Sequence, residues 1–393
     1  MTLYMLVLQQ EAMMDEEIRT YKIIIGSKAF FEVQVRLLEI TLKDEYEDFP
    51  INNFLELVRL SDKLKQRGSG FKDGDKASVM ILKNDNYHGI VEAAHDRLGS
   101  LIEELTTDNS IIYIHNPPTT LNVYLDGLYE RGKIMLSYER ETYAIKREPE
   151  KFSENMSRIA KNIFGQNEAI MEISKSMWYM TTINRKKPYV IMLYGDSSLG
   201  KSELVREIAD KFYDKKFVEK HLSMFKNETY SYYFFGDRPN RKSLGFDLME
   251  RESNLVFLDE LDKCPEYFLS AFYTLFDNTV FCDATYELDI SGLLIILTSN
   301  YSNVNEMKDR LGLPIFYRID KFIHFNEFNE KTIYDITMSE IEAHVNECGG
   351  KFSVDDVYER VSPIIQATGE NARTIKNKVQ EIIENILFEE ISQ

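Results

Sequence analysis

The chain has 393 residues, a hydrophobic share of 44% and a formal net charge of −18 at pH 7. This length predicts two or three domains, each able to bury its own core. The acidic balance argues against broad binding to nucleic acid or to anionic membranes, because such binding needs a basic surface.

Residues 1–150 predict an α+β domain. The apolar residues 1–8 lack a basic start and are too few to span a bilayer, so they predict a first strand and no membrane segment. Further strands are predicted from apolar or alternating runs at 21–25, 31–37, 77–82, 111–114, 121–125 and 134–138. Helices are predicted at 54–65 and 89–105, and a linker at 146–151. No motif here carries chemistry, so we infer from context alone that this domain recognises a partner protein.

A phosphate-binding loop is predicted next. The apolar run 189–194 precedes a glycine-containing loop, and the stretch 203–209 after it has helical character. The loop consists of Gly195, Asp196, Ser197, Ser198, Leu199, Gly200, Lys201 and Ser202. In this strand–loop–helix context the backbone N–H groups surround an anion, Lys201 reaches the β- and γ-phosphates, and Ser202 ligates Mg²⁺. The sequence therefore predicts a site for ATP and Mg²⁺.

Two further apolar runs end in polar residues suited to hydrolysis. The run 255–258 predicts a buried parallel strand that ends in Asp259 and Glu260. Asp259 is suited to hold Mg²⁺, mostly through water, and Glu260 to orient or deprotonate the attacking water. The run 293–297 leads to Asn300, which can hydrogen-bond the attacking water or the γ-phosphate. Together these residues predict hydrolysis of a nucleoside triphosphate.

The order of these motifs resembles the AAA+ ATPases, and most closely the Clp-type protein unfoldases. The resemblance covers about residues 156–393. It implies a large α/β nucleotide-binding subdomain over 151–330, built on a parallel sheet flanked by helices, and a small helical lid over 331–393. Helical spacing independently predicts three lid helices, at 332–348, 353–367 and 372–391. The segment 163–169 resembles one that packs on adenine, which implies nucleotide contacts for Phe164, Gly165 and Gln166.

The resemblance also implies an assembly of several copies, a hexameric ring or a helical oligomer. Arg318 lies in a stretch that resembles the arginine-finger motif, which reaches the γ-phosphate of the neighbouring subunit. Arg310 is a weaker candidate for the same or a supporting role. Arg373 lies in a stretch that resembles the start of the sensor 2 helix, which implies contact with the nucleotide from the lid.

Two stretches depart from the Clp-type pattern. Threading enzymes of this type carry a Gly-aromatic-Val-Gly pore loop, and the corresponding stretch 235–246 has none. Phe246 or Leu244 is a possible substitute, while its cations, Arg238, Arg241 and Lys242, suit an acidic or phosphate-bearing partner.

The second departure is the short connection between Asn300 and Arg318. It leaves no room for the loop that docks on a Clp-type peptidase, so no such docking is expected. We interpret residues 311–313 as a helix end, with Gly312 as the stop.

Two functions remain open after this comparison. The first is a Clp-like ATPase that remodels or disassembles a partner protein without a peptidase of its own. The second is an ATP-driven oligomeric switch that recruits or activates an effector, as in defence or signalling systems. The missing pore-loop aromatic favours the switch, the overall motif match favours the remodeller, and the acidic charge disfavours a nucleic-acid loader.

The cysteines bear on the compartment. Cys264, Cys282 and Cys348 are far apart and show neither metal-ligand spacing nor a disulfide framework. A reducing cytoplasm is therefore expected.

Overall fold

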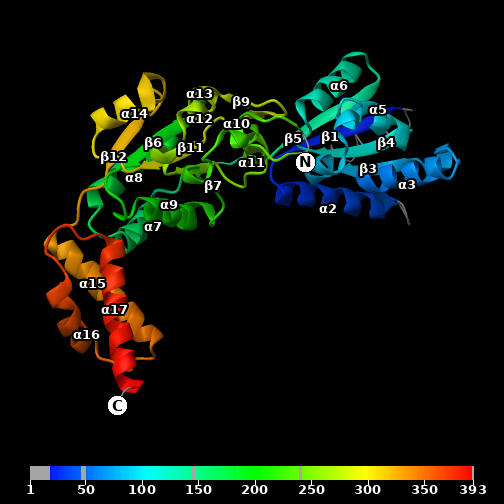
Figure 1. The fold of residues 1–393 in the computed structure, drawn as a ribbon. Helices are drawn as coiled ribbons and strands as arrows, with labels where there is room; N and C mark the ends of the chain where they lie inside the picture. Colours follow the sequence, from blue (N-terminus) through cyan, green and yellow to red (C-terminus); the bar gives the residue numbers. More distant parts are fainter. Residues whose placement is uncertain (1–17, 46–49, 144–146, 184, 239–240, 392–393) are drawn as a thin grey trace. The chain divides into compact units, whose positions relative to one another are not determined.

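The computed structural model describes residues 18–45, 50–143, 147–183, 185–238 and 241–391 (Figure 1). Its contacts divide the chain into two compact units. The first unit joins the chain up to Tyr143 with two later segments, Asn227–Glu252 and Val280–Asp289. The second unit contains the remainder. The strand expected at residues 1–8 lies outside the described residues.

The first unit is built on a five-stranded sheet with the order β2-β3-β4-β1-β5, in which every pair of neighbours is parallel. Its strands are β1 (Arg19–Ile25), β2 (Ile51–Asn53), β3 (Ala77–Leu82), β4 (Thr106–His115) and β5 (Ile134–Arg140). The predicted strands at 21–25, 77–82, 111–114 and 134–138 are confirmed. Parallel strands need crossover connections, and helices supply them here.

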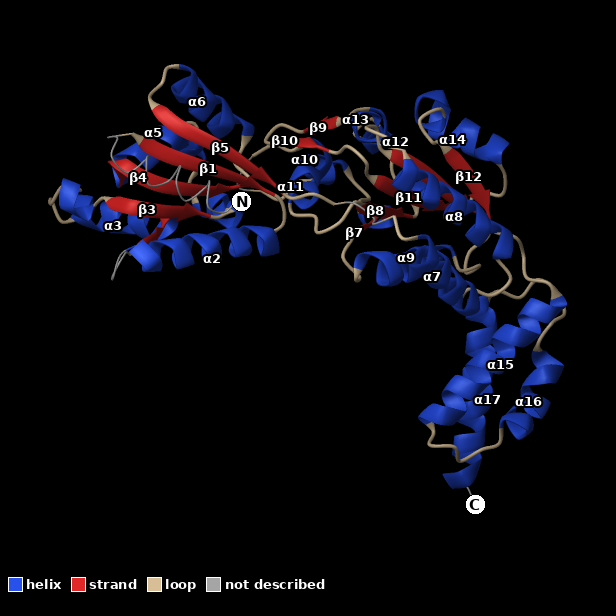
Figure 2. Ribbon diagram, turned by 180° about the vertical axis from the view of Figure 1, so that it is seen from behind, coloured by secondary structure: helices blue, strands red, loops and turns tan. Residues whose placement is uncertain are grey.

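Helices cover both faces of this sheet, as Figures 1 and 2 show for α2 and α6. The helices are α2 (Lys28–Glu45), α3 (Phe54–Gln66), α4 (Glu92–His95), α5 (Leu98–Leu105) and α6 (Thr119–Glu130). One apolar core lies under α2 and a second, larger core gathers side chains of α3, α5 and α6. The helix expected at 54–65 is confirmed, whereas the one expected at 89–105 is broken into α4 and α5.

Two predicted strands are wrong. Residues 31–37 belong to α2, because Phe31, Leu38 and Leu42 recur at helical spacing and are buried. Residues 121–125 belong to α6, where Leu121, Leu125 and Leu128 are likewise buried on one face. Strands and helices therefore alternate along this part of the chain.

The two later segments of the first unit contribute two short helices and a hairpin. These are α10 (Ser231–Phe235), α11 (Leu244–Met249), β9 (Val280–Cys282) and β10 (Glu287–Asp289). The two strands pair antiparallel.

The second unit is built on another parallel sheet, with the order β12-β6-β11-β8-β7. Its strands are β6 (Tyr189–Tyr194), β7 (Val218–His221), β8 (Leu255–Asp259), β11 (Leu294–Ser299) and β12 (Lys321–His324). The helices around it are α7 (Pro149–Asn162), α8 (Asn167–Thr182), α9 (Lys201–Tyr213), α12 (Glu266–Leu269), α13 (Phe272–Asp277) and α14 (Val304–Phe316). The central strands β6, β8 and β11 are almost wholly buried, as their apolar sequences predicted.

Three helices follow the sheet and form a bundle, which Figure 2 shows as helix only. They are α15 (Glu330–Glu347), α16 (Val354–Val361) and α17 (Ala372–Ile391), close to the predicted helices. Their apolar side chains belong to the same core cluster as those of α7, α8 and α9. Among the described residues, no helix combines the length and apolar character needed to cross a bilayer.

Candidate active site

The loop between β6 and α9 has glycine at two positions where the backbone conformation disfavours a side chain. Gly195 has φ +131°, and a Cβ atom there would lie 2.5 Å from the carbonyl oxygen of Phe325. Gly200, which precedes α9, has φ +97°. L-residues with side chains rarely adopt these angles, so both glycines are needed to turn the chain from strand to helix.

Lys201 is the first residue of α9 and is buried. Its Nζ donates hydrogen bonds to the carbonyl oxygens of Gly195 and Asp196, at 2.7 and 2.6 Å, and to Oδ1 of Asn300 at 3.2 Å. Burial lowers the pKa of Lys201 to about 8, although nearby carboxylates oppose this shift. The amine therefore lies at the centre of the loop, where an anion would neutralise it.

Asp259, at the end of β8, is held by side chains from three other elements. Its Oδ1 accepts hydrogen bonds from the hydroxyls of Ser202, at 2.9 Å, and Thr298. Its Oδ2 lies 3.1 Å from Nδ1 of His221 on β7. A carboxylate and a hydroxyl this close together suit a hard cation such as Mg²⁺.

Glu260 follows Asp259 in a left-handed conformation, with φ 58° and ψ 51°. Its backbone N–H donates to the hydroxyl of Thr298 at 2.9 Å, which ties the end of β8 to the neighbouring strand β11. Asn300 lies just beyond β11, and its N–H is 3.3 Å from Oδ1 of Asp262. The ends of two adjacent strands thus present Glu260 and Asn300 at one edge of the sheet.

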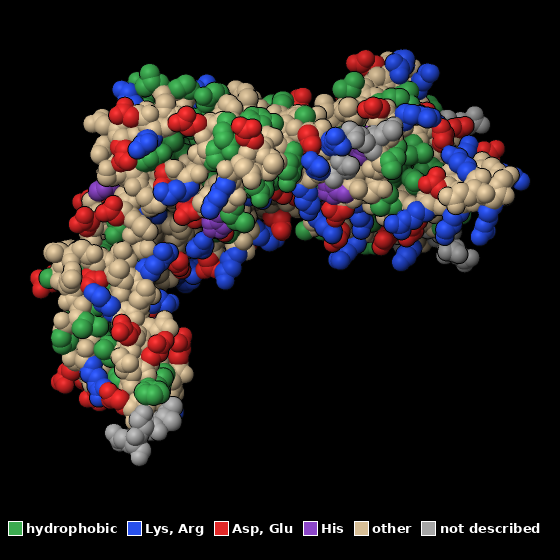
Figure 3. Space-filling model, viewed as in Figure 1, with side chains coloured by type: hydrophobic (Ala, Val, Ile, Leu, Met, Phe, Trp, Pro, Cys, Tyr) green, Lys and Arg blue, Asp and Glu red, His purple; other side chains and the backbone are tan. Residues whose placement is uncertain are grey.

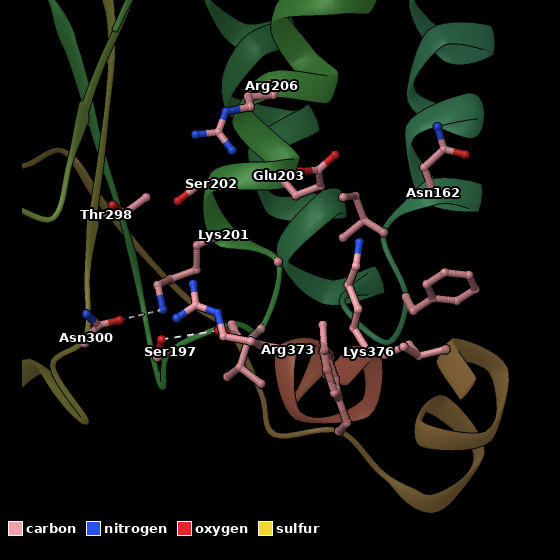
Figure 4. Close-up of a pocket in the computed structure, with 18 of the residues that line it drawn as sticks. Asn162, Ser197, Lys201, Ser202, Glu203, Arg206, Thr298, Asn300, Arg373 and Lys376 are labelled. Atoms are coloured by element: carbon pink, nitrogen blue, oxygen red, sulfur yellow. Dashed lines mark hydrogen bonds between the residues drawn. The ribbon is translucent and has the colours of Figure 1, made fainter. Parts of the chain in front are cut away.

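Six of the residues described above line one pocket of about 680 Å³, within the size range of ligand sites: Lys201, Ser202, Asp259, Glu260, Thr298 and Asn300. Figure 4 shows Lys201 and Ser202 entering it from the P-loop and Arg373 and Lys376 from the start of α17. The predicted site residues in its wall are Phe164, Ser197, Ser198, Leu199, Gly200, Lys201, Ser202, Asp259, Glu260, Asn300 and Arg373.

Gly165 and Gln166, expected at the adenine, are not among the residues that line this pocket. Gln166 is almost wholly buried, and its side-chain amide pairs with the backbone of Asn326, at 2.9 and 3.2 Å. A Cβ atom at Gly165 would lie 2.6 Å from Cγ2 of Thr332. Both residues therefore pack against the chain near the start of α15, and Phe164 alone of the three faces the pocket.

Arg318 is also outside the pocket wall. Its Nη1 donates to the carbonyl oxygen of Pro314 at 2.7 Å, and its Nε is 3.7 Å from Oδ2 of Asp277. The guanidinium lies over the ring of Tyr273. Within one copy of the chain, Arg318 is therefore paired away from the site.

Sequence reasoning missed three residues near the nucleotide site. Lys376 and Arg206 line the pocket, and His221 contacts Asp259. Helical spacing is the signal that finds the first two, since Lys376 follows Arg373 by three positions and Arg206 follows Ser202 by four. His221 has no such signal, because only sheet pairing brings β7 beside β8.

In the stretch 235–246, the apolar side chains of Leu244 and Phe246 are both buried, so neither is exposed to a partner. Arg241 is paired with Asp237 at 3.3 Å and stacks over Tyr232. The expected substitutes Leu244 and Phe246 are therefore core residues. Two of the expected cations, Arg241 and Arg238, already lie within 4 Å of the carboxylate of Asp237, at 3.3 and 3.9 Å. On the face that Figure 3 shows, Lys and Arg side chains are interspersed with Asp and Glu.

The connection between Asn300 and Arg318 is occupied by α14. Gly312 interrupts this helix with φ 72° and ψ 157°, which agrees with its predicted role as a helix stop. No extended loop occurs among these residues, all of which are described.

Comparison with known proteins shows which protein family part of this chain matches. Residues 191–326 match the family "ATPase family associated with various cellular activities (AAA)". The chain is 23% identical to the chaperone protein ClpB of Mycoplasmoides gallisepticum over 262 residues, which are 59% of this chain and 36% of that protein. It is 24% identical to a ClpA homologue, an ATP-binding subunit of the ATP-dependent Clp protease, of Cyanidium caldarium over 295 residues, 63% of this chain and 34% of that one. It therefore spans about a third of the length of these relatives.

A third relative and a solved structure are also similar. The mitochondrial disaggregase of Homo sapiens is 25% identical over 162 residues, 37% of this chain and 22% of that protein. A cryo-electron-microscopy reconstruction of Hsp104 with ATPγS and casein matches with a TM-score of 0.51. That match has 12% sequence identity and covers 98% of this chain and 91% of the other, so it supports the fold alone.

Proposed function

Because the chain carries an AAA+ ATPase domain of the Clp type, we propose that it works as an ATP-hydrolysing homo-oligomer that remodels or disassembles a partner protein. One observation carries the hydrolytic part of this proposal. Lys201, Ser202, Asp259, Glu260 and Asn300 line a single pocket of suitable size at the carboxyl edge of a parallel sheet. That edge is where open α/β sheets bind nucleotides.

Some of these pocket residues would bind ATP and Mg²⁺, and others would assist the hydrolysis of ATP. Lys201 and the N–H groups of the loop would hold the phosphates of ATP. Ser202 and Asp259 fit Mg²⁺ by their oxygen chemistry and their 2.9 Å separation. When bound, this ion neutralises phosphate charge. Glu260 would orient or deprotonate the attacking water, and Asn300 would hydrogen-bond it.

Arginine and lysine side chains complete the proposed site. Arg373 and Lys376 would contact the phosphates from the lid, which couples lid position to nucleotide. Arg318 would act on the nucleotide of a neighbouring copy, since its own pocket does not include it. This role requires assembly, for which we propose a hexameric ring or a helical oligomer.

The second candidate function, a switch that recruits or activates an effector, is favoured by one specific observation. Leu244 and Phe246, the two expected substitutes for the pore-loop aromatic, are buried, so neither can grip an extended chain, and Phe235 is the exposed aromatic of this stretch. We therefore expect action on a particular partner in the cytoplasm, recognised by the first unit. Generic threading and docking on a Clp-type peptidase are not expected.

Glu260→Gln tests the hydrolytic assignment. We expect nucleotide binding to persist and ATP hydrolysis to fall by about 10²-fold or more, the effect of losing a general base. Lys201→Ala should instead abolish binding of a fluorescent ATP analogue. The matched control is Glu266→Gln, an exposed change on α12 that should leave both measurements intact. Normal hydrolysis by Glu260→Gln would refute the assignment.

A folded fluorescent protein carrying an unstructured tag tests for generic threading. Rapid loss of its fluorescence with ATP would place this chain among generic unfolding enzymes. Retained fluorescence would support action on a particular partner, and ATP-dependent binding of that partner without its dissociation would then favour the switch over the remodeller.

A further inference from the structure

The N-terminal sheet has a crevice of the kind that binds ligands. Strands β1 and β4 are parallel neighbours, yet the chain leaves β1 for α2 on one face and β4 for α6 on the other. This makes the carboxyl ends of β1 and β4 a topological switch point, where open α/β sheets receive their ligands. The side chains at this edge are polar and buried, among them His115, Asn116 and Asn84.

The occupant of this crevice is a carboxylate from a distant part of the same chain. Oε1 of Glu250 accepts a hydrogen bond from Nδ2 of Asn84 at 2.7 Å and another from Nδ2 of Asn116 at 3.4 Å. Nδ1 of His115 lies 3.8 Å from the same oxygen. Asn84 is 1% exposed, so without Glu250 its amide would lose a charged acceptor in a buried setting. Asn116 is 0% exposed, and its amide also donates to the carbonyl oxygen of Gly26 at 2.8 Å.

Further contacts hold the two later segments in the first unit. The N–H of Thr119 donates to the carbonyl oxygen of Thr285 at 2.9 Å. The rings of His88 and Phe246 are 5.1 Å apart, and the guanidinium of Arg251 lies over the ring of Tyr143. The segments therefore pack, through polar and aromatic contacts, with helices and loops that surround the N-terminal sheet.

Both segments continue directly into strands that carry the proposed catalytic residues. Glu250 precedes β8, which begins at Leu255 and delivers Asp259 and Glu260. The hairpin ends at Asp289 and precedes β11, which leads to Asn300. Only a few residues of backbone thus connect these segments to the start of each strand, and the strand itself leads on to the proposed catalytic residues.

We propose that the Glu250 carboxylate, seated among Asn84, Asn116 and His115, is a latch that couples the N-terminal sheet to the nucleotide site. The proposal rests on the proposed function, because it assigns to the first unit the regulation of that ATPase. While Glu250 is hydrogen-bonded in this way, which is the closed latch, the segment 244–252 moves together with the N-terminal sheet. Coupling between two sites is reciprocal, so nucleotide at the P-loop changes the latch and a partner on the N-terminal sheet changes hydrolysis.

Swapping the amide and the carboxylate between positions 84 and 250 tests the latch in the whole 393-residue chain. Asn84→Asp places two carboxylates together and opens the latch. The double variant Asn84→Asp/Glu250→Gln restores one amide facing one carboxylate. Amide hydrogen exchange of residues 111–116 and 244–249 should be about tenfold faster in the single variant, the scale of losing a hydrogen bond to a charged group. It should return toward the wild-type rate in the double variant.

The control for this experiment is Glu228→Gln, an exposed change on the same segment as Glu250, which should leave exchange unchanged. Unchanged exchange in Asn84→Asp, or equal exchange in the single and double variants, would overturn the latch. If the single variant does not fold, recovery of folded protein in the double variant supports the latch, and failure to recover contradicts it.

Adding ATPγS tests the coupling. We expect exchange at residues 111–116 to change by about fivefold in the wild type and in the double variant, and not in Asn84→Asp. Binding of a fluorescent nucleotide is followed in the same samples. A protein that binds no nucleotide would contradict the proposed function, whereas binding without any effect at 111–116 would contradict the coupling alone.

Discussion

The guanidinium of Arg318 lies over Tyr273, with its Nε 3.7 Å from the carboxylate of Asp277. This arrangement keeps the proposed finger residue out of the pocket of its own chain. If Arg318 serves a neighbour, hydrolysis per chain should rise with protein concentration, and Arg318→Ala should reduce it by about 10³-fold. A steady-state ATPase assay over a dilution series measures both effects.

Mixing variants sharpens the test of Arg318. Arg318→Ala and Glu260→Gln proteins, each inactive alone, should regain activity when combined, because some interfaces then pair an intact Glu260 with an intact Arg318. Arg310→Ala, on α14, tests the weaker candidate for the same role, and we expect it to retain activity. A concentration-independent rate from a monomer would contradict action between copies.

Replacing Gln166 is predicted to lower the stability of the fold more than it lowers the affinity for nucleotide. Its side chain makes two hydrogen bonds to the backbone of Asn326 in a buried setting. Gln166→Ala should lower the free energy of unfolding by about 1–3 kcal/mol, measured by urea denaturation, since it leaves backbone groups unpaired. Gln380→Ala removes an exposed glutamine and should have little effect. A large loss of nucleotide affinity without loss of stability would restore the adenine contact that the family resemblance implied.

Gly195→Ala should distort the phosphate-binding loop. The residue has φ +131°, and a Cβ atom would lie 2.5 Å from the backbone oxygen of Phe325, which cannot move aside without shifting β12. We expect a cost of about 2 kcal/mol or more in the free energy of unfolding and loss of nucleotide binding. Gly70→Ala is the control, because no atom lies within 4 Å of its added Cβ. Normal binding by Gly195→Ala would show that the loop tolerates a side chain.

Acid should destabilise the first unit through His115. Burial lowers the pKa of this imidazole, while Glu250, Asp85 and Glu141, together with the Gly26 carbonyl, oppose the shift. The folded protein therefore binds the proton less readily than the unfolded chain, whose histidine titrates near pH 6.5. Stability conferred by the neutral ring is complete above about pH 6.5 and is lost as pH falls toward the lower folded pKa, by at most about 1.4 kcal/mol per pH unit.

Urea midpoints between pH 7.5 and pH 5 measure this effect. His115→Gln should flatten the pH dependence, whereas the control His344→Gln, in the second unit, should leave it unchanged. An equally steep dependence in His115→Gln would assign the acid sensitivity to other groups.

Local sequence determined the nucleotide-binding half of this protein to a large extent. The apolar runs at 189–194, 255–258 and 293–297 are buried strands, because a central strand of a parallel sheet is covered on both faces. The side chains placed after them meet in one pocket, since the carboxyl ends of parallel strands share one edge. These features depend on short-range patterns, which a single sequence contains.

The sequence pattern predicted the wrong element where its apolar residues fitted both the alternation of a strand and the spacing of a helix. In residues 31–37 alternation suggested a strand, but the spacing of Phe31, Leu38 and Leu42 also fits a helix, and packing against the sheet selected the helix α2. The same competition decided residues 119–130.

Only the tertiary structure decided which distant segments pack together. Asn84 and Glu250 are 166 positions apart, and Gln166 and Asn326 are 160 apart, yet each pair is joined by hydrogen bonds. Neither residue of such a pair leaves a periodic signal, because the bond depends on the path of the whole chain between them. For that reason the sequence determined where ATP is expected to bind, while the membership of residues 227–252 and 280–289 in the first unit came from the fold.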